Sequence, residues 1–153
     1  MIDDSTVFSL SYYCPQERQD AAIKYLIDNA DNFSEEDIGS LLERGCQDTY
    51  INTVKVLSAI GYPKISKAIP KLFELFQDLN WLGSMEAFEL LYTLPPEAYI
   101  SDLNNTIKEA LDTDDECWVH GIEEFIYKAN IAEKIDKELY RRFMEAYDRY
   151  FND

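Results

Sequence analysis

The chain has 153 residues, of which 46% are hydrophobic and 14% aromatic, so it has enough apolar side chains to bury a core and is not a disordered polymer. Thirty acidic residues against fourteen lysines and arginines give a formal net charge of −16. This balance argues against a nucleic-acid ligand, because a phosphate backbone requires a basic stripe on the protein surface.

The cysteines and the N-terminal segment indicate the cellular compartment in which the protein is expected. Cys14, Cys46 and Cys117 stand at unrelated spacings, which does not predict a disulfide framework and favours a reducing compartment. The first ten residues, MIDDSTVFSL, place acids where a secretory signal has basic residues. No stretch approaches the ~20 apolar residues of a membrane-spanning helix. We therefore expect a cytoplasmic protein without a membrane segment.

Apolar residues recur at helical spacing along the chain, and no segment shows a sustained period of two. Ile100, Leu103, Ile107 and Leu111 form one such stripe. In chain order, the breakers between the helical patterns are ADNFSE, Gly45, GYPK, TLPPE and LDTDDE. The predicted helices cover residues 17–29, 35–44, 49–60, 64–76, 80–93, 97–111, 116–129 and 132–150.

The predicted helices form four antiparallel pairs, with an acid at the same place between successive pairs. These acids are Asp48, Asp78 and Asp115, and the intervals of 30 and 37 residues predict a weak internal repeat. No pair can bury its apolar face alone, so stacked pairs predict a short all-α solenoid of the HEAT kind, in one domain over residues 1–153. The irregular period leaves an irregular helical bundle as the alternative.

Acids stand directly before two of the predicted helices, in the segments QDLNWLGS and DDECW. A carboxylate or amide at this position accepts the unpaired backbone N–H groups of the first helical turn, which is worth ~1 kcal/mol. We expect Asp78 or Asn80 to cap the first of these helices, and Asp114 or Asp115 to cap the second.

The tryptophans that follow these acids, Trp81 and Trp118, are expected to wedge between successive pairs, and their segments resemble a known family. FQDLNW at 76–81 and DDECW at 114–118 are similar to segments of the domain of unknown function 5071 family, which is mostly bacterial and α-helical. The resemblance covers roughly residues 62–126, and Leu82 stands where the family usually has proline. It implies a helical-repeat fold and no activity. Small acidic helical proteins of such families often resemble immunity proteins, which neutralise a toxin made by the same cell.

The segment DTDDECWVHGIE at 112–123 is the densest in potential metal ligands. Its acids Asp112, Asp114, Glu116 and Glu123 match positions 1, 3, 5 and 12 of a calcium loop. Cys117, however, occupies the position where the sharp turn of that loop requires glycine. We therefore expect an acidic helix cap here and no calcium site.

Cys117 and His120 stand three residues apart and could meet on one helix face, as a zinc pair or a nucleophile and its base would. The rest of either site is missing, because His120 is the only histidine and the other cysteines lack zinc-ligand spacing. We expect no metal, no cofactor and no catalytic activity.

Negative charge combined with many aromatics predicts a module that binds another protein. The most concrete form is an immunity protein that binds and neutralises a basic toxin or effector domain, in which acids steer the partner and aromatics supply the desolvated centre. A structural adaptor without inhibitory role is the alternative, and an enzyme built around Cys117 and His120 ranks third. The candidate partner-binding residues are Asp48, Tyr50, Asp78, Trp81, Asp114, Asp115, Glu116 and Trp118.

Overall fold

The structure, a computed structural model, describes residues 1–152, and within that range α-helices are joined by loops and short 3₁₀ turns, without a β-strand. The all-α class predicted from the apolar spacing is therefore confirmed. Over the same range, no helix is both long enough and apolar enough to cross a membrane.

The helices from α2 onward cover the segments that the helical spacing predicts, except that the predicted helix 35–44 is divided at Ser40 into two short helices. The α-helices are α1 (Asp4–Phe8), α2 (Gln16–Asp28), α3 (Glu35–Gly39), α4 (Leu41–Arg44), α5 (Tyr50–Ile60), α6 (Ile69–Glu74), α7 (Ser84–Thr93), α8 (Ile100–Asp112), α9 (Glu116–Ala129) and α10 (Lys137–Phe151). The 3₁₀ turns are η1 (Ala30–Asn32), η2 (Ser66–Ala68), η3 (Leu75–Gln77), η4 (Pro96–Ala98) and η5 (Ala132–Lys134).

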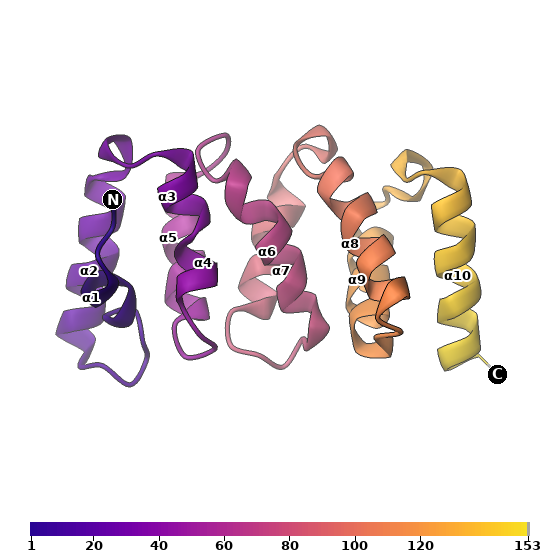
Figure 1. The fold of residues 1–153 in the computed structure, drawn as a ribbon, viewed down its shortest axis with the longest axis horizontal. Helices are drawn as coiled ribbons and strands as arrows, with labels where there is room; N and C mark the ends of the chain where they lie inside the picture. Colours follow the sequence, from indigo (N-terminus) through magenta and orange to yellow (C-terminus); the bar gives the residue numbers. More distant parts are fainter. Residues whose placement is uncertain (153) are drawn as a thin grey trace.

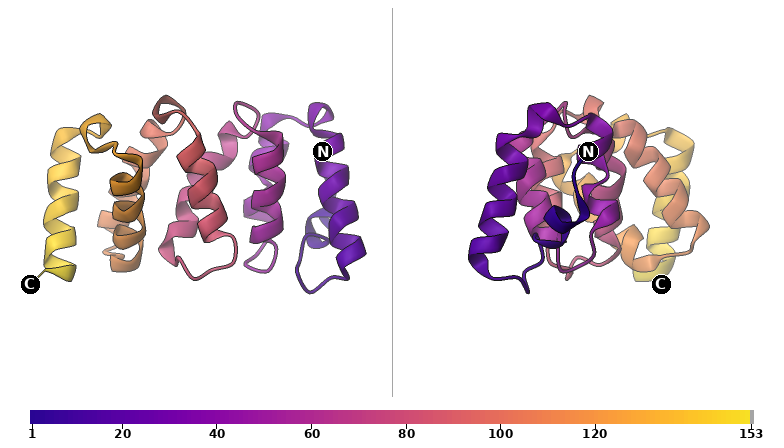
Figure 2. Two further views of the ribbon diagram at one scale, coloured as in Figure 1. Left: turned by 180° about the vertical axis from the view of Figure 1, so that it is seen from behind. Right: turned by 60° about the vertical axis from the view of Figure 1, so that its left-hand side comes forward.

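The helices stand side by side in a row that is two helices deep, with the chain termini at opposite ends (Figure 1). One layer contains α2, α5, α7 and α9, and each of these helices packs against the next. The other layer contains α4, α6, α8 and α10, which also pack in that order. The first layer comes to the front when the molecule is seen from behind (Figure 2). The HEAT type of repeat stays a prediction, as does the irregular bundle that is its alternative.

α6 and α8 begin later than predicted, after the turns η2 and η4. Three further differences at helix starts have local reasons. α1 has no counterpart among the predicted helices, and its single turn is capped by Asp3, which accepts the Thr6 N–H at 2.8 Å. α7 starts later than predicted, because Gly83 adopts a left-handed φ of 98° that a helix cannot contain. α10 starts only after the turn η5, where Asp136 caps its first turn.

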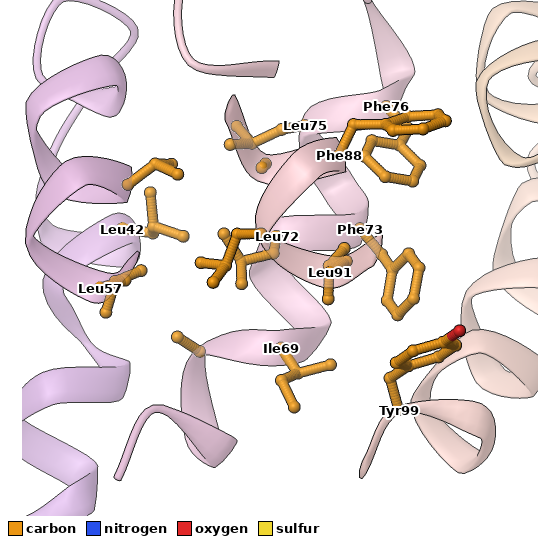
Figure 3. Close-up of a cluster of buried hydrophobic side chains, with 14 of the residues drawn as sticks. Leu42, Leu57, Ile69, Leu72, Phe73, Leu75, Phe76, Phe88, Leu91 and Tyr99 are labelled. Atoms are coloured by element: carbon orange, nitrogen blue, oxygen red, sulfur yellow. The ribbon is translucent and has the colours of Figure 1, made fainter. Parts of the chain in front are cut away.

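Five aromatic rings at the centre of the row join helices from different pairs. Phe73, Phe76, Phe88, Tyr99 and Phe125 come from α6, η3, α7, the turn before α8, and α9. Neighbouring ring centroids lie 5.3 to 6.0 Å apart. Figure 3 shows four of these rings beside buried leucines of α4, α5 and α6. Each aromatic pair at this separation contributes about 0.5–1.5 kcal/mol beyond its buried area, so the cluster holds the central helices together.

α9 approaches α6 and η3 so closely that side-chain volume is excluded between them. Trp118 is 1% exposed, and its indole N–H donates a hydrogen bond to the Phe73 carbonyl oxygen at 2.9 Å. One turn further along α9, a Cβ atom added at Gly121 would lie 2.4 Å from the Phe76 carbonyl oxygen. Because that neighbour is backbone, which cannot rotate away, this position requires glycine.

We predict that Gly121→Ala destabilises the fold although it introduces a better helix former. Alanine gains about 1 kcal/mol of helix propensity over glycine in a helix interior, but overpacking against backbone costs typically about 1–3 kcal/mol. Since the clash is with backbone, which cannot rotate away, we expect a cost of about 2–3 kcal/mol and so a net loss of about 1–2 kcal/mol, measured by urea unfolding. Ser58→Ala, at an exposed position of α5, is the control and is expected to be neutral or slightly stabilising. Equal stability of Gly121→Ala and wild type would contradict the close approach.

Candidate functional site

The connections between successive helical pairs all lie along one side of the row, at the bottom of Figure 1. We call this side the loop edge. It comprises residues 9–15, 45–49, 78–83 and 113–116, together with the C-terminal turn of α10. The acids predicted between the pairs therefore share one edge of the molecule.

Asp48 links two connections of the loop edge, residues 9–15 and 45–49, by hydrogen bonds. Its carboxylate accepts hydrogen bonds from the Ser11 hydroxyl and the Cys46 thiol, and its carbonyl oxygen accepts the Tyr12 N–H at 2.9 Å. The Cys46 thiol, followed by the Ser11 hydroxyl, lowers the pKa of the Asp48 carboxyl below its ordinary value. Tyr50, the next predicted site residue, is partly buried and packs against the core. Both residues therefore stabilise the edge in addition to facing it.

Asp78 shapes the connection before α7 and does not cap that helix. One carboxylate oxygen accepts the Asn80 N–H at 2.8 Å, and the carbonyl oxygen accepts the Ser84 hydroxyl at 2.9 Å. The residue before α7 is Gly83, which has no side chain to serve as a cap, so the expected cap by Asp78 or Asn80 is wrong. Trp81 is partly buried against the core and precedes its helix, whereas Trp118 lies within α9. The two tryptophans are thus not placed alike relative to their helices.

The acids before α9 have separate structural roles. Asp115 caps the helix by accepting the Trp118 N–H at 2.9 Å, which confirms one of the two expected caps. Asp114 instead bonds to the C-terminal turn of α10, where it accepts from the Tyr150 hydroxyl and pairs with Arg149 at 3.3 Å. Trp118 is buried, which agrees with the predicted wedge between helical pairs and not with its place among the candidate partner-binding residues.

Two predicted acids remain open to a partner. Glu116 is exposed, Asp78 is partly exposed, and neither forms a salt bridge within residues 1–152. Asp112, at the end of α8, is also exposed and without an ion pair in that range. The loop edge therefore keeps negative charge that the protein does not neutralise itself.

Large apolar side chains lie exposed on the same edge, and periodicity did not identify them. Phe8 at the end of α1 is 60% exposed, Tyr12 and Tyr13 are 40% and 77% exposed, Leu82 is 48% exposed and Phe151 is 45% exposed. None of them belongs to the predicted apolar stripes. A large apolar residue in a loop or at a helix end, outside every stripe, is the sequence signal that could have found them.

Cys117 and His120 lie on the first two turns of α9. Cys117 is exposed, and the His120 ring packs against Phe151 with centroids 5.5 Å apart. The His120 Nδ1 atom is buried and has no hydrogen-bond partner among the described residues. In the same part of the chain, no three His, Cys, Asp or Glu side chains are arranged to hold a metal ion.

No protein-family model, no curated protein and no solved structure matches this chain. The resemblance of the two tryptophan segments to the domain of unknown function 5071 family accordingly stays a prediction. Any function has to be argued from the geometry of the loop edge.

We predict that Asp115→Ala lowers stability by about 1 kcal/mol, because it leaves the Trp118 N–H without its acceptor at the start of α9. In a chain of this length that corresponds to about 2–4 °C in melting temperature. Asp115→Asn retains an acceptor and should lose much less. Glu116→Ala, one residue further on, controls for the loss of a negative charge near the helix dipole; an equal loss in both alanine variants would contradict the cap.

We predict that Asp48 stabilises the fold at neutral pH and that this stabilisation is lost in acid. A carboxyl whose pKa is lower in the folded state stabilises the fold above its unfolded pKa, ~3.9, and this contribution is lost as the pH falls through the folded pKa. Asp48→Asn should therefore flatten the decline of unfolding free energy between about pH 5 and 2, measured by urea unfolding. Ser11→Ala removes one donor and should flatten it partly. An unchanged decline in both variants would show that the carboxylate contacts contribute nothing.

Proposed function

We propose that the chain is a protein-binding module that recognises a basic protein through the loop edge. The observation that carries this proposal is the coincidence, on one edge, of carboxylates without internal ion pairs and exposed large apolar side chains. Glu116, Asp78 and Asp112 supply the charge, while Tyr13, Leu82 and other exposed side chains supply apolar surface. Interfaces commonly combine these features, an apolar centre for affinity and charges for orientation.

Long-range electrostatics support a basic partner in particular. A net charge of −16 creates a negative potential that extends about one Debye length, ~8 Å at physiological salt. Two arginines near the loop edge are already engaged, Arg44 with Asp4 and Arg149 with Asp114. A basic surface approaching this edge would be attracted at a distance and would then find unpaired carboxylates at contact.

The favoured form of the proposal is an immunity protein, which binds and neutralises a basic toxin or effector domain. Inhibition by occlusion requires a charged, partly apolar surface, and the loop edge combines exposed carboxylates with exposed apolar side chains. The resemblance of the tryptophan segments points in the same direction. A partner that keeps its full activity in the complex would instead indicate an adaptor.

The test compares charge reversal on the loop edge with an equal reversal elsewhere. Asp112→Lys with Glu116→Lys changes the loop edge, whereas Asp31→Lys with Glu133→Lys makes the same change in net charge on the opposite connections, in η1 and η5. Proteins captured by the wild-type chain are identified, and their association is measured by stopped flow at several salt concentrations. We expect basic partners, an association rate that falls steeply with salt, and a loss of ~10-fold or more for the loop-edge variant alone. An equal loss of association rate in both variants would show that net charge is the cause and would refute binding through the loop edge.

A further inference from the structure

A cavity of about 340 Å³ opens on the loop edge beneath the first two turns of α9. Its walls come from three elements that are distant in sequence: the connection between η3 and α7, the start of α9, and the end of α10. The side chains that matter for its chemistry are Asp78, Asn80, Glu116, Cys117, His120 and Phe151. Nothing in the function proposed above assigns a role to this cavity.

The charge of the cavity is negative and unbalanced. Asp78 and Glu116 line it from opposite elements, and neither forms an ion pair in the described part of the chain. The nearest arginine in sequence to Phe151 is Arg149, which is already paired with Asp114. A cation that entered the cavity would therefore meet two carboxylates without displacing a lysine or arginine side chain of the protein itself.

The start of α9 acts in the opposite sense, but more weakly. A helix N-terminus carries an effective charge of roughly +0.5, which favours anions. Asp115 already accepts the Trp118 N–H there, and Glu116 stands in the first turn. Two full negative charges, Asp78 and Glu116, outweigh half a positive one, so the cavity selects a cation and repels an anion.

The shape of the cavity distinguishes between cations. The rings of His120 and Phe151 lie with centroids 5.5 Å apart and form an aromatic wall, and 45% of the Phe151 surface is exposed. A planar guanidinium group stacks on such a wall and presents several N–H donors in its plane, whereas an ammonium group is a compact, strongly hydrated charge. The lining of the cavity also offers acceptors for these donors, the two carboxylates and the Asn80 side-chain amide oxygen.

We propose that this cavity is the anchor site for an arginine side chain of the basic partner. The proposal deepens the function proposed above and rests on it for the source of the arginine, but the recognition of a guanidinium group is testable without any partner. Cys117 can report on occupancy of the cavity, because its exposed thiol lines it. Cys46, an exposed thiol outside the cavity, is the reference, and the change in each rate on adding peptide is compared with that thiol's own rate without peptide.

The experiment measures the alkylation rates of both thiols by mass spectrometry, in the full chain, with a small maleimide. The probes are three blocked tripeptides, Gly-Arg-Gly, Gly-Lys-Gly and Gly-citrulline-Gly. We expect the arginine peptide to slow alkylation of Cys117 in a saturable way and to leave Cys46 unchanged. Citrulline has the same shape without the charge and should not protect, and lysine should need ~5-fold or higher concentration. No protection by the arginine peptide, or equal protection by lysine, would overturn the proposal.

Variants link the protection to the two carboxylates. Glu116→Gln and Asp78→Asn preserve shape, and each should weaken protection by about 3- to 10-fold. Asp112→Asn removes the same charge from the loop edge at a residue outside the cavity wall, so it should retain at least half of the wild-type protection. Melting temperatures close to the wild type verify that all three variants fold. Equal weakening in all three would show that general negative charge, and not the cavity, binds the peptide.

The outcomes separate this proposal from the proposed function. Salt-sensitive binding of a basic protein that is unaffected by Glu116→Gln or by alkylation of Cys117 would uphold the loop edge and overturn the arginine anchor. Selective protection of Cys117 by the arginine peptide, in a chain that captures no basic protein, would uphold the anchor and overturn the proposed function.

Discussion

The packing of α9 against α6 and η3 is the contact on which the rest of the structure depends. Trp118 inserts its ring between these elements and donates to the Phe73 carbonyl, and Gly121 lets the backbones meet. The aromatic cluster then joins α6, α7 and α9 around Phe125. Since α10 packs on both α8 and α9, its place at the end of the row depends in part on this contact. The cavity below α9 depends on the same contact.

The alternating direction of the helices explains why so many acidic residues lie on the loop edge. Each pair goes up and returns, so every connection between pairs must lie on the same side (Figure 1). Helix starts favour acids, which accept the free N–H groups of the first turn. Some of these acids are used internally, Asp115 by α9 and Asp48 by the neighbouring connection. Others, Glu116 above all, stay exposed, so the acids that stabilise the fold and those that would meet the proposed partner are of the same kind.

Sequence periodicity predicts the helices well, because a helix that packs on one side must repeat its apolar residues at 3.6-residue spacing. It predicts their starts less well. The start of α7 depends on the backbone conformation of Gly83 and on its close approach to α5, where a Cβ would lie 2.9 Å from the Ile51 nitrogen. Such a contact joins residues far apart in the chain, and no local pattern contains it.

The candidate site could be predicted only in outline. The acids between pairs are visible in the sequence, and so is their placement on one edge once antiparallel pairs are assumed. Their hydrogen-bond partners cannot be predicted from the sequence, because the hydrogen bonds between Asp114 and Tyr150 and between Asp48 and Ser11 join residues more than 30 positions apart. For Trp118 the sequence allows both a wedge between helical pairs and a partner-binding residue, because an aromatic after an acid is compatible with either position, and the structure buries its ring.

The glycine contacts have a consequence for how such a protein can change over time. At Gly83 and Gly121 the distance between neighbouring elements is set by backbone against backbone, not by the sizes of interlocking side chains. The spacing of the connections along the edge is therefore insensitive to what those connections carry. Residues at positions such as Leu82 or Glu116 can therefore be exchanged while the helices keep their spacing, so that, if the loop edge binds a partner as proposed, its specificity could change without a change of fold.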